Sequence, residues 1–146
     1  MESRYLTLII GGFIPAVLYG LAGFLQKWSA REGGSVSVYL IGFGLATFVA
    51  GIGSRYVLSD GPSPSRSLLI AVLGGLVFAI GAGLISFSII KFDAAISQLS
   101  PIYNMNILIT VLLGLLIFSE FRDLNGMRLL AGTVFIVVGG WLVSGA

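Results

Sequence analysis

The sequence contains neither cysteine nor histidine among its 146 residues. Without cysteine it has no disulfide framework. Without histidine it lacks the usual zinc ligand, the Ser-His-Asp arrangement and the commonest proton shuttle. No long uncharged run contains a carboxylate either, so the usual acid–base and nucleophilic groups are missing. We therefore expect no enzyme, no cofactor and no bound metal.

Charge is also scarce, at 10% of residues against about 25% in a soluble domain. Hydrophobic residues make up 57% of the chain, and its mean hydropathy is +1.05. The net charge of +2 is too small and too scattered for a nucleic-acid surface. This composition predicts an integral membrane protein whose partner is the lipid bilayer, with residues 1–146 forming one small domain.

Five uncharged runs stand between the charged residues, each 18 to 26 residues long. They are Tyr5–Gln26, Gly33–Ser54, Ser67–Ile90, Ala94–Ser119 and Leu129–Ala146. Each is near the roughly 20 residues that a spanning helix needs, and none alternates as a barrel strand would. The runs predict an all-α membrane protein with transmembrane helices at about 5–26, 35–57, 67–90, 94–118 and 126–144.

Small residues recur at helical spacing in two of these runs. Gly75, Ala79 and Gly83 follow one another at four-residue intervals, and Gly132 and Gly139 are seven residues apart. Such faces allow another helix to approach closely, within the chain or in a dimer.

The fourth run differs from the others because its first half is polar. Between Asp93 and Glu120 it carries Ser97, Gln98, Ser100, Tyr103, Asn104 and Asn106. Polar side chains at membrane depth are costly unless they face protein or a wet cavity. This half is interpreted either as the wall of a pathway or pocket, or as contacts between buried helices. Pro101 in this run and Pro15 in the first are expected to kink their helices.

The expected substrate pathway is lined by uncharged polar side chains. They are Gln26, Gln98, Tyr103, Asn104, Asn106 and Thr110. Amides and a phenol both donate and accept hydrogen bonds without charge, which suits a small polar or zwitterionic substrate. Tyr103, Asn106 and Thr110 share one helix face, whereas Gln98 and Asn104 point elsewhere. Lys27 is interpreted either as a snorkelling lysine or as a cation at the pathway mouth.

The positive charges favour an N-terminus inside and a C-terminus outside. The N-terminal side holds five, namely Arg4, Arg55, Arg66, Arg122 and Arg128. The other side holds three, namely Lys27, Arg31 and Lys91. An odd number of helices with so small a bias is also what a dual-topology protein shows.

Several short segments stand in a characteristic order along the chain. They are Leu99-Ser100-Pro101, Leu112-Leu113-Gly114, Glu120, Gly132, Gly139 and, in the first helix, Tyr19-Gly20. Together they resemble the EamA-type domain of the drug/metabolite transporter superfamily. The resemblance covers nearly the whole chain as one five-helix repeat. Most members carry two inverted repeats, so the chain resembles the single-repeat, bacterial/archaeal transporter type.

The resemblance implies export or exchange of small metabolites or drugs across the inner membrane of a prokaryote. A lone repeat would act as a dimer by alternating access, with an inverted copy of itself or a second five-helix subunit. Glu120 would be structural, pairing with Arg122 or Arg128. The four-helix exporters of the superfamily use a glutamate in helix one, but Gly11–Gly20 contains no acid. The alternative is a non-transporting accessory or scaffold subunit.

Overall fold

The computed structural model describes residues 2–58, 61–119 and 125–145, with side chains from residue 5 onward. The described segments are helical and hold five helices long and apolar enough to cross a membrane, as predicted. These five are Tyr5–Arg31, Val36–Leu58, Ser65–Phe92, Ile96–Ile117 and Gly126–Ser144. The chain is thus a multi-pass integral membrane protein. It divides into two compact units, Met1–Asp93 and Ala94–Ala146, and the expectation of a single domain stays a prediction.

In the first unit, the first span is continuous but not uniformly α-helical. It consists of α1 (Glu2–Leu8), the π-helical turn η1 (Ile9–Phe13) and α2 (Ile14–Arg31). Pro15 stands directly after this turn and has no N–H to give to the carbonyl of Gly11, four residues back. The N–H of Ile14 donates to Ile9, five residues back. The wider turn lets the helix pass the proline without ending.

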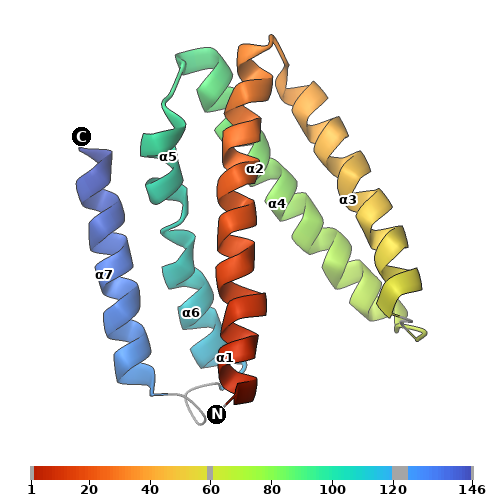
Figure 1. Ribbon diagram of the computed structural model, residues 1–146, viewed down its shortest axis with the longest axis vertical. Coiled ribbons are helices and arrows are strands. Elements are labelled where there is room, and N and C mark those ends of the chain that lie inside the picture. The colour runs from red at the N-terminus through yellow and green to blue at the C-terminus, as the bar shows by residue number, and fades with distance from the viewer. Residues whose placement is uncertain (1, 59–60, 120–124, 146) are drawn as a thin grey trace. The chain divides into compact units, whose positions relative to one another are not determined.

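The second and third spans form an antiparallel hairpin, α3 (Val36–Leu58) and α4 (Ser65–Phe92) (Figure 1). The turn from α2 into α3 is closed by the N–H of Gly34, which donates to the carbonyl of Ser29 at 2.9 Å. Gly33 adopts a φ of +86° there, a conformation that favours glycine. Phe43 of α3 stacks on Phe78 of α4 with ring centroids 5.6 Å apart.

The second unit consists of three helices. They are α5 (Ile96–Tyr103), α6 (Asn106–Ile117) and α7 (Gly126–Ser144). α5 and α6 together make the fourth span, which was expected as a single helix, and α7 packs against both of them (Figure 1). Asn125 caps α7, because its side-chain oxygen accepts from the N–H of Arg128 at 3.1 Å.

The chain covers little of its own apolar surface. Among the described residues, Ala82 and Ile89 are the only buried hydrophobic side chains, and large aliphatic and aromatic side chains are exposed on every span. In water such a surface would be untenable, but lipid tails cover it at no hydrophobic cost. Exposed apolar side chains therefore say little about function, and polar side chains at membrane depth, whether buried or exposed, say more.

Candidate functional site

The fourth span is interrupted at Asn104 and Met105. Their ψ angles are −9° and −12°, far from the −42° of a regular helix. The N–H of Met105 donates to Ile102, and that of Ile107 donates to Asn104, each at 3.1 Å and three residues back. The span therefore tightens into a 3₁₀-type turn, which divides it into α5 and α6.

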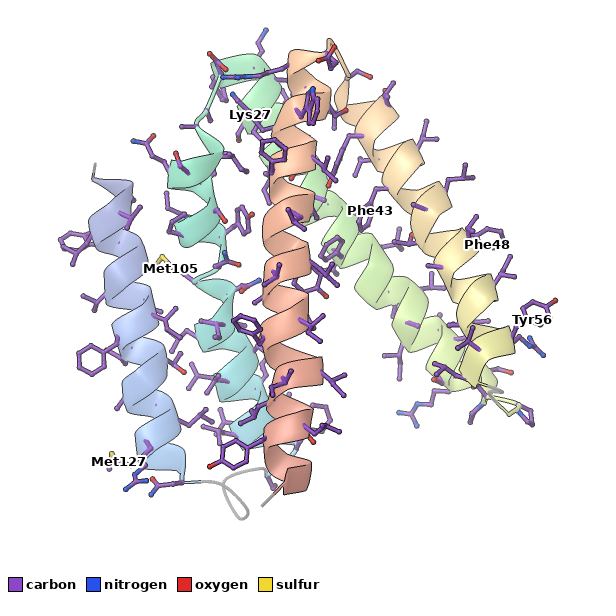
Figure 2. The ribbon with its side chains drawn as sticks, viewed as in Figure 1. Lys27, Phe43, Phe48, Tyr56, Met105 and Met127 are labelled. Carbon is purple, nitrogen blue, oxygen red and sulfur yellow. The ribbon has the colours of Figure 1, made fainter. Side chains whose placement is uncertain are left out.

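Beside this turn, the backbone of α5 touches α7. Gly140 is buried, and a Cβ added to it would lie 2.9 Å from the carbonyl oxygen of Pro101. The side chain of Met105 points from the turn toward α7, with its Cγ 3.6 Å from the same position (Figure 2). Gly140 is needed here because any side chain would separate the two backbones.

Asn106 lies at the midpoint of the fourth span, which runs from Ile96 to Ile117. It is exposed, and among the described residues its side chain has no hydrogen-bond partner. The neighbouring Asn104 is also exposed, and its amide makes only a long 3.4 Å contact with Ser100. Two carboxamides are thus left open at a depth where lipid offers nothing to bond with.

The other residues expected on this pathway are placed differently. Gln98 is exposed on α5, but it lies only two residues from the start of the span, near the interface. Thr110 is exposed on α6, and its hydroxyl donates to the backbone carbonyl of Asn106 at 3.3 Å. Tyr103 is half-buried at the end of α5. The expected common face of Tyr103, Asn106 and Thr110 therefore crosses the interruption instead of running along one regular helix.

Gln26, the sixth residue expected on the pathway, lies in the first unit and joins two helices. It is only 7% exposed, and its side-chain nitrogen donates to the hydroxyl of Ser86 at 2.7 Å and to the carbonyl of Ala82 at 3.2 Å. Ser86 is 2% exposed. The amide of Gln26 thus fixes α2 against α4, and its place on a pathway stays a prediction.

Lys27, the next residue along α2, pairs with the carboxylate that follows α4. Its ammonium nitrogen lies 2.7 Å from Asp93, and the two side chains are 14% and 95% exposed (Figure 2). The hydrogen bond from Lys27 and its charge lower the pKa of Asp93, with a smaller contribution from Arg31. The charge of Lys27 is therefore balanced, and its role as a cation at a pathway mouth stays a prediction.

Tyr19 was not among the expected site residues, although it lies close to the midpoint of the first span. Its side chain is 73% exposed, and no partner for its hydroxyl is found within the described residues. Its central place in an uncharged run was the available signal. Glu120, which was expected to pair with Arg122 or Arg128, lies outside the described residues together with Arg122.

Comparison of the chain with family models, curated proteins and solved structures found no match. Nothing in these comparisons identifies an EamA-type domain, so that resemblance stays an expectation from the sequence.

Proposed function

We propose that this protein is a membrane transporter of small, uncharged or zwitterionic polar solutes. It acts as a dimer by alternating access in the inner membrane of a prokaryote, and Asn104 and Asn106 line its pathway. The observation that carries the proposal is Asn106, an exposed carboxamide without a described partner at the midpoint of a span. Leaving such a group in lipid costs several kcal/mol by general estimates, so water, solute or another polypeptide covers it.

The interruption beside Asn106 supports a pathway. Irregular backbone at membrane depth is tolerated where it lines a water-filled cavity or is buried in protein. In transporters such discontinuous helices occur at midplane binding sites. The side chains here carry donors and acceptors but no charge, which fits a solute that crosses without a counter-charge.

Thiol accessibility distinguishes a wet pathway from a dry contact. The chain has no cysteine, so Asn106→Cys introduces a single thiol. Thiols react as thiolates, which form in water and not in lipid. A membrane-impermeant maleimide should label Asn106→Cys in the reconstituted protein. It should not label the control Val77→Cys, an exposed apolar position near the middle of α4.

Flux provides the direct test. Purified protein in liposomes is mixed with glycerol, urea, a pentitol or glycine, and vesicle volume is followed by light scattering. Asn106→Ala should slow the solute that the wild type admits. Thr47→Ala is the matched control, because Thr47 lies at the middle of α3 and its hydroxyl already bonds the backbone of its own helix. Equal flux through both variants would contradict the assignment of Asn106.

One observation favours the alternative, a non-transporting accessory or scaffold subunit. Gln26 shows that a carboxamide in this chain can join two helices through buried hydrogen bonds. Asn106→Cys could be labelled in the monomer but not in a dimer or in a complex with another subunit. In that case Asn106 joins two chains by buried hydrogen bonds, as Gln26 joins two helices.

A further inference from the structure

The turn between α5 and α6 has the features of a joint and not of a helix end. α-Helix continues on both sides of it, and the two residues between the halves, Asn104 and Met105, have ψ angles of −9° and −12°. The hydrogen bonds across the turn connect residues three apart, a pattern with poorer geometry than the regular helical bond. Asn104 favours this arrangement because asparagine is a weak helix former.

α7 spans this joint from one side. It packs against α5 and against α6, so it holds both halves of the broken span (Figure 1). Its two buried residues, Thr133 and Gly140, are seven positions apart and therefore lie on one face. The hydroxyl of Thr133 donates to the backbone carbonyl of Leu129 in the same helix, so Thr133 needs no hydrogen-bond acceptor from another helix.

α7 also contacts α5 next to the joint, where a Cβ added to Gly140 would lie 2.9 Å from the carbonyl oxygen of Pro101. Proline gives no N–H to the residue four before it, Ser97, so the turn of α5 that leads to this contact is also weakened. The turn weakened by Pro101, the 3₁₀-type turn at Asn104 and Met105, and the contact between Pro101 and Gly140 are the elements that a hinge with a pivot needs.

We propose that Asn104–Met105 is a hinge, and that α5 rocks against α6 on a pivot made by Pro101 and Gly140. α5 carries Gln98 and Tyr103, so its motion would open and close the approach to Asn106. The hinge stands on the geometry alone, whereas its use in gating rests on the proposed transport function. Separate measurements distinguish the two, namely distances across the joint for the hinge and solute flux for gating.

Paired spin labels across the joint test the hinge. Because the chain has no cysteine, Ser97→Cys with Leu116→Cys gives two defined labels, one on each half. A straight helix would hold these positions about 28 Å apart. The reference pair, Met127→Cys with Leu142→Cys, lies along unbroken α7 at about 22 Å. In liposomes the distance distribution across the joint should be roughly twofold broader than along α7, or bimodal.

A variant that closes the joint makes the test sharper. Pro101→Ala restores an N–H, and Asn104→Ala adds a strong helix former. The double variant should narrow the distribution to that seen along α7. Pro15→Ala, which alters a proline in the other unit, should leave it unchanged. The hinge would be refuted if the wild-type distance distribution across the joint were as narrow as the one along α7. It would also be refuted if the distribution across the joint in the double variant were as broad as in the wild type.

The pivot has its own matched pair. Gly140→Ala should shift the distances across the joint, because its Cβ pushes against the Pro101 carbonyl, whereas the Cβ of Gly139→Ala enters open space. A distribution unchanged by Gly140→Ala places the pivot elsewhere and refutes that part of the proposal. The double variant Pro101→Ala, Asn104→Ala could fold, give a narrow distance distribution across the joint and still admit solute at the wild-type rate. That result would support the hinge and contradict its role in gating.

Discussion

Adjacent glycines on α7 give the sharpest test of how the second unit is held together. A Cβ on Gly140 would lie 2.9 Å from the carbonyl oxygen of Pro101, 3.5 Å from its carbonyl carbon and 3.6 Å from Cγ of Met105. Contacts of 3.4 Å or more are ordinary for a Cβ, so the backbones must separate by 3.4 − 2.9 = 0.5 Å. A Cβ on Gly139 meets nothing within 4 Å.

The expected magnitudes follow from two opposed effects. Alanine is favoured over glycine inside a helix by about 0.5–1 kcal/mol, and this applies to both positions. Overpacking against a backbone that cannot rotate away costs about 1–3 kcal/mol, and this applies to Gly140 alone. Gly140→Ala should therefore be about 1–3 kcal/mol less stable than Gly139→Ala, which should equal or exceed the wild type.

Unfolding in mixed detergent micelles measures this difference. Trp141 lies one residue after Gly140 and two after Gly139 and reports on the second unit, while Trp28 lies in the first. Hydrogen exchange of α5 amides should also quicken in Gly140→Ala and not in Gly139→Ala. If both variants are equally stable and α5 is equally protected from hydrogen exchange in both, then α5 does not pack against α7 at Gly140.

Three further predictions concern single contacts. Asp93→Asn should lower thermal stability at pH 7, because it removes the ion pair with Lys27 but tolerates the positive φ of 49°. The pKa of Asp93 is lowered in the folded protein, so the ion pair contributes its full stability above the unfolded pKa of about 3.9. The difference in thermal stability between Asp93→Asn and the wild type should therefore disappear as the pH falls through the lower pKa of the folded state. A gap that persists in strong acid would show that charge is not its cause. A double-mutant cycle of Gln26→Leu and Ser86→Ala should give a coupling energy of about 0.6–1.7 kcal/mol, and zero coupling would deny the hydrogen bond. Asn125→Ala should destabilise α7 by about 1 kcal/mol while Asn125→Asp retains the cap, measured by hydrogen exchange of its first turn.

The positions of the spans could be predicted because each rests on a local property of the sequence. Uncharged runs of sufficient length give helices in lipid, where no other open structure satisfies the backbone. The break in the fourth span is different. Hydropathy is blind to backbone angles, so the run from Ala94 to Phe118 reads as one helix. Asparagine at 104 gives only a weak local signal for a turn, and the neighbouring contact joins Pro101 and Met105 to Gly140, which is 39 and 35 residues away in the sequence.

Helix rotation was the second feature that the sequence could not specify. Gly132 and Gly139 form the evident small-residue pair on the last span, yet both face open space, and Gly140 makes the contact. On α4, a Cβ added to Gly83 would meet Leu40 of α3 at 3.4 Å, an ordinary van der Waals contact, while one added to Gly75 would meet nothing within 4 Å. These spans are apolar on every side, so no polar face shows which side is turned inward.

The third feature that the sequence could not specify was which polar side chains from distant parts of the sequence pair with one another. Gln26 and Lys27 are neighbours with similar surroundings in the sequence, and their polar ends suggested a pathway and its mouth. In the structure Gln26 bonds Ser86 and Lys27 pairs with Asp93, which are 60 and 66 residues away in the sequence. Neither pairing leaves a trace in composition or spacing, because a single amide or charge finds its partner only when the helices are side by side.

The polar side chains of the spans therefore fall into groups that differ in how their hydrogen bonds are met. Hydroxyls such as those of Thr47, Ser88 and Thr133 bond the carbonyl of their own helix, and they need no neighbour. A carboxamide has both donors and an acceptor to satisfy, so it needs a second element. Gln26 has one in α4, and Asn106 has none among the described residues. Because lipid supplies neither donor nor acceptor at that depth, whatever covers Asn106 has to be polar. Water there would favour the proposed transporter, and a contact with a second chain would favour the proposed accessory or scaffold subunit.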